Sequence, residues 1–183
     1  EVLLAARVVV NGETTYSGSL VALAGGPKTL AEVRGQRLAV TGLDSLSGYL
    51  APMAVLRWEG IRPTDLGEIV MAGNHSRALA LLHSGRVDVA ATFDGAVALF
   101  KQRFPHVELR TLGSFRDLPT DMVLVNASLS PTRRYSLVSA LKRISTEPSA
   151  ADVRGDLAHG AITGFAEGRE SDFVGMERWI ESD

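Results

Sequence analysis

The chain contains no cysteine among its 183 residues, so disulfide bonds and thiol chemistry are excluded. It also has no apolar run of about 18 residues, the length that a membrane-spanning helix needs, and we predict no such span. Neither sign of charge dominates, because 19 Lys and Arg residues stand against 21 Asp and Glu residues, for a net charge of −2. Such a chain has no overall attraction for nucleic acid or for an anionic membrane, so any anion must be bound locally.

The hydrophobic content of 45% is sufficient for a core, and the length allows one large domain or two small lobes. Between Gln36 and Leu112, strand-like apolar runs alternate with helical patterns. This alternation predicts an α/β fold with a parallel sheet and covering helices. We expect residues 29–115 to form one complete α/β ligand-binding lobe, and residues 1–28 and 116–183 to form the hinge and the remainder of the other lobe.

The two flanks contain too few predicted strands for a complete second lobe. We interpret Val2–Val10 and Ser19–Ala24 as a pair of adjacent strands, 114–121 as irregular, and 147–172 as loops and short helices. The chain also begins abruptly in an apolar run, without a basic and then apolar leader, so we expect that a segment preceding Glu1 is absent. A chain truncated in this way would leave a sheet edge open and could form a dimer to cover it.

The stretch Ser45–Pro52 follows the apolar run Arg37–Val40 and predicts a strand, a short hydroxyl-bearing turn and a helix over Ser47–Trp58. The first N–H groups of a helix have no partner within it, and the helix dipole places partial positive charge there. Ser45 and Ser47 can therefore either cap the helix or donate hydrogen bonds to an oxyanion.

A second turn of the same kind follows the next predicted strand. The residues Gly73-Asn74-His75 connect Ile69–Ala72 to a predicted helix over Ser76–Ser84. A lone histidine is most often structural, but a histidine at a helix start can donate to an oxyanion. Two such turns in one small α/β unit predict a pocket for an anion such as phosphate or phosphonate.

Further polar residues join the candidate site by their position. Asp94 follows a predicted strand at the end where open α/β sheets bind ligands, and Tyr16 lies where the chain would cross between lobes. Asp88, at the start of the same strand, is expected to bond to backbone groups.

The sequence also lacks the motifs of several function classes. No two histidines have a metal-ligand spacing with nearby carboxylates, so we predict no metal and no cofactor. The nucleophile elbow of hydrolases, the zinc-protease motif and the phosphate-binding loop of nucleotide hydrolases are absent, so we predict no enzyme and no catalytic residues. A serine paired with His75 would imitate a nucleophile and its base, but no third orienting group is visible.

Four motifs together resemble one family. They are residues 30–40 (Leu-Ala-Glu-Val-Arg-Gly-Gln-Arg-Leu-Ala-Val), 45–52 (Ser-Leu-Ser-Gly-Tyr-Leu-Ala-Pro), 73–75 with 85–91 (Gly-Asn-His and Gly-Arg-Val-Asp-Val-Ala-Ala) and 114–121. In this order and spacing they resemble the phosphonate- and phosphite-binding branch of the periplasmic substrate-binding proteins of ABC importers. The resemblance implies a two-lobed class II periplasmic-binding fold that closes on its ligand and delivers it to a membrane permease. It also implies a periplasmic or extracytoplasmic location, with lipid anchoring through the absent N-terminus as one form.

The resemblance also implies which residues form the ligand site. In the family, a hydroxyl-rich turn and a histidine hold the phosphorus oxyanion, and other positions meet the substituent of the ligand. The matching oxyanion positions are Ser45, Leu46, Ser47 and His75, and the family's acidic positions fall near Asp94, Gly95 and Asp121.

Two of these positions depart from the family pattern. Leu46 replaces a threonine, which removes one hydroxyl donor but retains the backbone N–H. Gly95 stands where an acidic residue would meet an aminoalkyl group, so a smaller or differently substituted oxyanion is favoured. The ligand remains open among phosphonate, phosphite and phosphate. The alternative function is the ligand-sensing domain of a regulator or receptor with the same architecture.

Overall fold

The computed structural model describes residues 1–147 and 162–180. Its contacts divide the chain into two compact units. The first unit consists of Glu1–Tyr16 with Pro119–Val174, and the second unit consists of Ser17–Leu118 with Gly175–Asp183. The second unit begins at Ser17, which differs from the expected boundary at residue 29, because the strand through Ser17 pairs within this unit. The assignment of residues 29–115 as a ligand-binding lobe stays a prediction.

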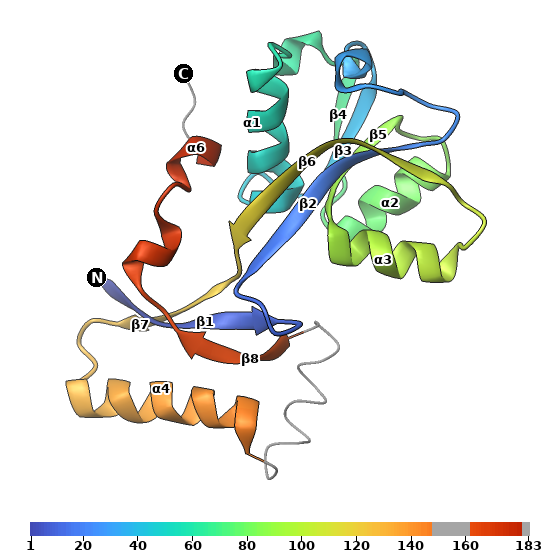
Figure 1. The fold of residues 1–183 in the computed structure, drawn as a ribbon. Coiled ribbons are helices and arrows are strands. Elements are labelled where there is room, and N and C mark those ends of the chain that lie inside the picture. The colour runs from blue at the N-terminus through green and yellow to red at the C-terminus, as the bar shows by residue number, and fades with distance from the viewer. Residues whose placement is uncertain (148–161, 181–183) are drawn as a thin grey trace. The chain divides into compact units, whose positions relative to one another are not determined.

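A five-stranded sheet in the order β4-β3-β5-β2-β6 forms the centre of the second unit (Figure 1). Its strands are β2 (Thr15–Leu23), β3 (Arg37–Val40), β4 (Glu68–Met71), β5 (Val89–Phe93) and β6 (Leu109–Pro119). β3 pairs in parallel with both β4 and β5, whereas β2 pairs antiparallel with β5. The predicted α/β fold with a parallel sheet is thus confirmed for β3, β4 and β5.

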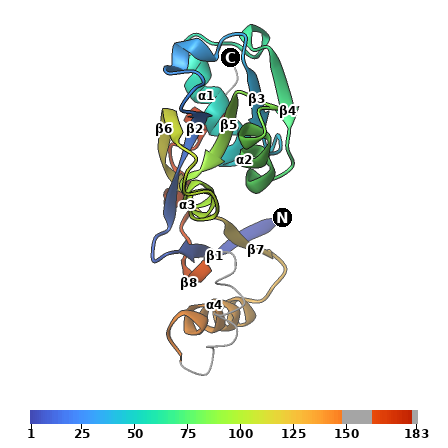
Figure 2. The same cartoon turned by 90° about the vertical axis from the view of Figure 1, so that its right-hand side faces the viewer.

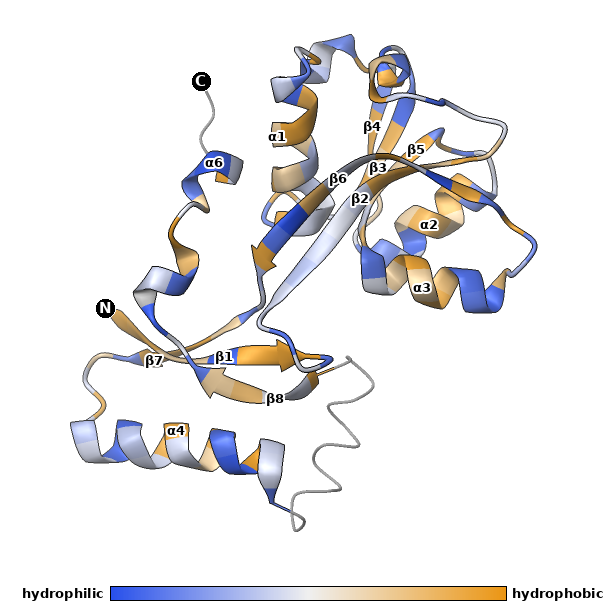
Figure 3. Ribbon diagram, viewed as in Figure 1, coloured by the Kyte–Doolittle hydropathy of each residue, from blue (hydrophilic) through white to orange (hydrophobic). Residues whose placement is uncertain are grey.

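Helices cover both faces of this sheet, with α2 and α3 on one face and α1 on the other (Figures 1 and 2). The helices of the second unit are η1 (Leu30–Val33), η2 (Leu46–Leu50), α1 (Ala51–Trp58), η3 (Pro63–Asp65), α2 (His75–His83), α3 (Asp94–Arg103) and α6 (Glu177–Ile180). Figure 3 shows that α2 and α3 each carry hydrophobic and hydrophilic residues, as expected for helices with one buried face. No helix in the described ranges combines the length and apolar character needed to cross a membrane.

The core between the sheet and α2 positions the start of that helix. Val21, Ala39 and Ala90 come from three neighbouring strands and belong to one buried cluster with Leu79 and Leu82 of α2. Truncation of a buried leucine to alanine typically costs about 2–5 kcal/mol, so these contacts hold α2 firmly. The first turn of α2 is therefore held against one edge of the sheet.

An ion pair connects β3 to the start of β5. Arg37 donates from its backbone N and from Nε to Asp88 Oδ2, at 2.9 and 2.8 Å, and from Nη2 to Asp88 Oδ1 at 2.7 Å. These hydrogen bonds from the guanidinium lower the pKa of the Asp88 carboxyl. The expected bonding of Asp88 to backbone is confirmed, and its bonding to the Arg37 side chain reinforces the parallel β3–β5 pairing.

The first unit contains a three-stranded antiparallel sheet in the order β7-β1-β8. Its elements are β1 (Val2–Val10), β7 (Met122–Asn126), α4 (Pro131–Thr146), β8 (Ile162–Glu167) and η5 (Glu170–Phe173). Figure 3 shows β1 as mostly hydrophobic and α4 as mostly hydrophilic. α4 packs on β8, where Ser145 Oγ accepts a hydrogen bond from Phe165 N at 2.9 Å.

Three expectations about the flanks are wrong. β1 does not pair with β2, because β7 and β8 already occupy both edges of β1. The stretch 114–121 is not irregular, since β6 continues to Pro119. β8 lies within a stretch expected to hold only loops and short helices. In the sequence, Gly164 is a loop signal and obscures this strand. A Cβ at Gly164 would lie 2.1 Å from Ser145 Oγ, so the close approach of α4 to β8 requires glycine.

Two further side-chain arrangements belong to the second unit. Thr29 makes no side-chain cap for η1, and Glu32 Oε2 instead accepts from Lys28 N at 2.9 Å. Trp58 is 56% exposed, whereas its ring partner Trp179 is buried.

Replacement of Asp88 by asparagine should test the role of the Arg37–Asp88 pair. Hydrogen bonds to charged groups contribute about 1.5–3 kcal/mol, and the carboxylate is partly exposed, so we expect a loss of about 1–2 kcal/mol in the free energy of unfolding. Urea denaturation measures this loss. The control is Glu167→Gln, which removes an exposed ion pair with Lys142 and should therefore cost less than Asp88→Asn. Equal losses in both variants would contradict this role.

Candidate functional site

Three helical segments begin at one edge of the second unit's sheet. β3, β4 and β5 run in the same direction, so their carboxyl ends meet at that edge. Each strand is followed by a helical segment, namely η2 with α1 after β3, α2 after β4 and α3 after β5. The N-terminal ends of these segments carry unpaired N–H groups and partial positive charge, and open α/β sheets bind ligands at this edge.

The turn after β3 is a π-helical segment that leads directly into α1. Tyr49 N and Leu50 N both donate to Ser45 O at 3.0 Å, and Ser45 Oγ accepts from Gly48 N at 3.1 Å. Ser45 therefore caps the segment as an acceptor, and its own hydroxyl hydrogen takes no part in that bond. Ser47 lies within the segment and is buried. The expected helix over Ser47–Trp58 is confirmed in position, with η2 forming its first turn.

Thr41 joins the two turns of the candidate site. Its N–H donates to Gly48 O at 3.1 Å, and its carbonyl accepts from Gly73 N at 2.9 Å. Its buried Oγ1 has no hydrogen-bond partner among the described residues. A Cβ on Gly48 would lie only 1.9 Å from this oxygen, so a glycine is required there for the turn after β3 to approach Thr41. One residue at the end of β3 thus sets the position of both turns.

The turn after β4 places His75 as the first residue of α2. Asn74 Oδ1 caps the helix by accepting from Arg77 N at 2.8 Å, and Gly73 has a φ of 83°, which favours glycine. His75 Nδ1 lies 3.3 Å from Thr92 Oγ1 of β5, and the imidazole packs edge-on against Phe93 with ring centroids 4.9 Å apart. Burial of the half-buried imidazole lowers the pKa of His75, which favours the neutral form of the ring.

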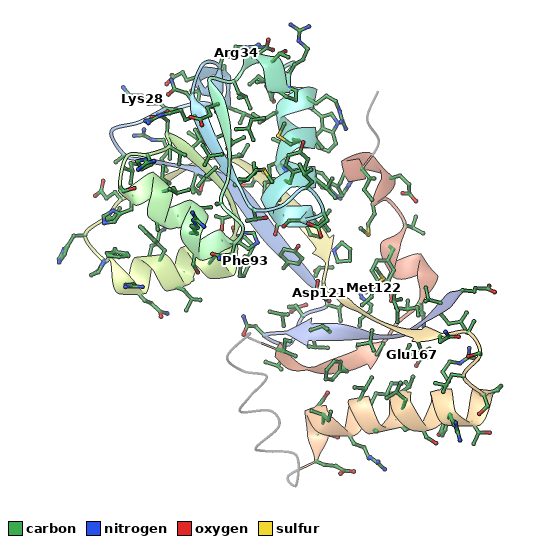
Figure 4. All side chains as sticks on the ribbon, turned by 180° about the vertical axis from the view of Figure 1, so that it is seen from behind. Lys28, Arg34, Phe93, Asp121, Met122 and Glu167 are labelled. Carbon is green, nitrogen blue, oxygen red and sulfur yellow. The ribbon has the colours of Figure 1, made fainter. Side chains whose placement is uncertain are left out.

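The turn after β5 brings an acidic group to the same edge. Asp94 is exposed and is the first residue of α3, and Ser19 Oγ of β2 donates to Asp94 Oδ1 at 3.0 Å. The carboxylate offsets the positive end of the α3 dipole, so this helix start is less suited to an anion than the other two. Figure 4 labels Phe93 at the junction between β5 and α3.

Five of the predicted site residues lie in the second unit, and two belong to the first unit. Ser45, Leu46, Ser47, His75 and Asp94 all lie at the carboxyl edge of the second unit. Tyr16 and Asp121 belong to the first unit, where Asp121 O accepts from Val8 N at 2.9 Å. The role of each of these residues in binding a ligand stays a prediction.

Sequence reasoning missed Thr41, Thr92 and Ser19. Thr41 immediately follows the predicted strand, and this position could have identified it as a residue of the candidate site. Thr92 and Ser19 face each other across the antiparallel β2–β5 pair, and the sequence contains no signal for that pairing.

No group of three or more His, Asp or Glu side chains is arranged to hold a metal ion in the part of the chain that the structure describes. The donors at the carboxyl edge are instead backbone N–H groups, hydroxyls and a neutral imidazole. Such a set suits an oxyanion, which accepts hydrogen bonds, better than a cation.

A parallel sheet whose strands end in donor-bearing helix starts is typical of the class II periplasmic-binding fold. The chain belongs to the family of periplasmic substrate-binding proteins of phosphonate ABC transporters, because residues 2–173 match that family. The family membership confirms the resemblance of the four sequence motifs. No curated protein sequence matches the chain.

Solved structures confirm the fold. The XAC2383 protein of Xanthomonas citri, bound to ATP, has a TM-score of 0.74 and 20% identity, with 93% of this chain and 66% of that chain covered. A binding protein component of an ABC phosphonate transporter from Pseudomonas aeruginosa (PA3383) has a TM-score of 0.75 and 18% identity, with 95% and 60% covered. PhnD1 from Prochlorococcus marinus, in complex with methylphosphonate, has a TM-score of 0.73 and 15% identity, with 96% and 69% covered. The chain therefore spans about two thirds of the length of these proteins.

Replacement of Gly48 by alanine should disrupt the turn after β3. A Cβ at this position would lie 1.9 Å from Thr41 Oγ1 and 2.7 Å from Thr41 Cγ2, so we expect a loss of about 1–3 kcal/mol in the free energy of unfolding. The double variant with Thr41→Ala removes both atoms and should lose less than the sum of the two single variants. Denaturant unfolding of the four proteins measures this coupling, and strict additivity would contradict the contact.

The stability of the unliganded protein should depend on the protonation of His75. The pKa of His75 is lowered in the folded protein, so the unfolded chain binds a proton first as pH falls through 6.5. The free energy of unfolding should therefore decrease below that pH. Urea denaturation at about pH 5.5 and about pH 7.5 should show a smaller decrease in His75→Gln than in the unaltered protein. The same decrease in both would show that His75 does not contribute.

Proposed function

We propose that the chain is the substrate-binding component of an ABC importer and captures a phosphorus oxyanion such as phosphonate, phosphite or phosphate. One observation carries the proposal: in a member of this family, the starts of η2 and α2 lie at the same sheet edge and are joined through the backbone of Thr41. Hydroxyls from Ser45 and Ser47 and the imidazole of His75 accompany those starts.

The binding follows from hydrogen bonds and helix dipoles rather than from cationic side chains. An oxyanion at the carboxyl edge would accept from backbone N–H groups at the starts of η2 and α2, and from the side chains of Ser45, Ser47 and His75. Leu46 contributes its backbone N–H alone. Hydrogen bonds to a charged group contribute about 1.5–3 kcal/mol each, so a few of them can replace the water shell of the ligand.

Capture, and not chemical conversion, fits the groups that surround His75. A histidine that acts as a general base is usually oriented by a carboxylate, as in the serine hydrolases. The partner recorded for His75 is the Thr92 hydroxyl, and no carboxylate is recorded on this imidazole within the described residues. This supports the proposal that the chain is not an enzyme.

The partners and location of the chain follow from the family and belong to the proposal. The partner is an ABC permease in the membrane, and the location is periplasmic or extracytoplasmic, with a lipid anchor as one possible form. A dimer and a ligand contact from Asp94, Asp121 or Tyr16 also stay predictions. The alternative of a regulator's ligand-sensing domain is not favoured, because the family match covers residues 2–173 and names a transport protein.

Replacement of His75 by alanine should lower the affinity for the ligand more than tenfold, since it removes one charge-assisted hydrogen bond. Calorimetry with phosphite, methylphosphonate, phosphate, sulfate and an organic acid first identifies the best ligand of the unaltered chain, and the variant is then compared on that ligand. The matched control is His83→Ala, because His83 is the last residue of the same helix and contacts Phe100 and Phe104.

The control variant should keep the affinity of the unaltered chain within about twofold. If the unaltered chain binds a phosphorus oxyanion but His75→Ala binds it equally well, His75 is not part of the site. If the unaltered chain binds none of the phosphorus oxyanions, the proposed function is wrong for this chain.

A further inference from the structure

Thr92 is buried behind His75 and contacts it through a single polar atom. Thr92 lies in β5 and has no exposed surface, and its Oγ1 lies 3.3 Å from His75 Nδ1. Its cross-strand neighbour is Ser19, whose Oγ donates a hydrogen bond to Asp94 Oδ1 at 3.0 Å. Thr92 has no part in the function proposed above, and neither the family match nor the solved structures assign it a role.

The burial of Thr92 decides which of the two atoms donates. A threonine hydroxyl has one hydrogen, and a buried hydroxyl hydrogen without an acceptor costs about 1–3 kcal/mol. His75 Nδ1 is the acceptor recorded for Thr92 Oγ1 in the described ranges. The hydroxyl is therefore satisfied when it donates to Nδ1, whereas a hydrogen on Nδ1 would leave it without this acceptor.

The consequence lies at the other nitrogen of the ring. A neutral imidazole carries one hydrogen, so a nitrogen that accepts from Thr92 leaves the hydrogen on Nε2. Nε2 can then donate a hydrogen bond to an oxyanion. With the hydrogen on Nδ1, Nε2 would instead present a lone pair to the anion, and the two would repel each other.

We propose that Thr92 is a positioning residue that holds the neutral His75 ring in the tautomer with its hydrogen on Nε2, so that His75 can only donate to a bound ligand. The edge-on contact with Phe93, at 4.9 Å between ring centroids, keeps the ring plane fixed while Thr92 fixes the hydrogen. The site then favours a ligand whose oxygen at this point is a deprotonated acceptor. This inference rests on the proposed function, in which His75 contacts the oxyanion.

The test compares Thr92→Val, which keeps the shape of the side chain but removes the hydroxyl, with Thr92→Ser, which keeps the hydroxyl. The ¹⁵N chemical shifts of the histidine ring nitrogens report the tautomer directly, and the signals of His75 are assigned from their loss in His75→Gln. The measurement is made at about pH 8, where the imidazole is neutral. The matched control is Thr120→Val, because Thr120 is a buried threonine of the first unit whose Oγ1 donates to Val8 O and Thr14 O.

In the unaltered chain and in Thr92→Ser, the His75 shifts should show the hydrogen on Nε2. In Thr92→Val they should move toward the other tautomer, and affinity for the phosphorus oxyanion should fall about tenfold. Thr120→Val should change neither the His75 shifts nor the affinity. The tautomer is read in the unliganded protein, so a failure of the proposed function leaves this part of the test intact.

Unchanged His75 shifts in Thr92→Val would overturn the inference, whatever the protein binds. Changed shifts with unchanged affinity would also overturn it, because Thr92 would then set the tautomer without any effect on ligand binding. A loss of affinity in Thr92→Val that Thr92→Ser fails to restore would assign the effect to packing and contradict a role for the hydroxyl.

Discussion

Parallel pairing of β3 with both β4 and β5 is the constraint on which the candidate site depends. Because these three strands run in one direction, their carboxyl ends and the helical segments that follow them meet at one edge of the sheet. The double interaction of Arg37 with Asp88 holds the opposite end of the β3–β5 pair. Antiparallel pairing at either position would send one of the turns to the far edge, and the donors of Ser45 and His75 would no longer share a site.

The donors considered at this edge are backbone N–H groups, hydroxyls and an imidazole. Thr41 links the two turns through its backbone, and the absence of a side chain at Gly48 allows that contact. In the proposed site, a neutral imidazole, two serine hydroxyls and the N–H groups of two helix starts would supply donors and partial positive charge. Under the proposed function, such a site would favour small oxyanions by hydrogen-bond geometry, which is consistent with a chain whose net charge is −2.

The sequence was sufficient to predict the centre of the second unit, because β3, β4 and β5 are short apolar runs that alternate with helical patterns. It was also sufficient for the positions of Ser45, Ser47 and His75 at helix starts. It failed at β8, where Gly164 is required by the contact with Ser145 and appears as a loop signal. It failed for Thr92 and Ser19 because their partners are set by long-range strand pairing, which local patterns do not contain.

The most direct measurement is a titration of the ¹⁵N-labelled chain with methylphosphonate, followed through the backbone amide signals. The account predicts the largest shifts at residues 46–47 and 74–76, where the N–H groups of the two helix starts would meet the oxyanion. Shifts confined to other segments, such as the β-sheet of the first unit, or no shifts with any phosphorus oxyanion, would contradict it.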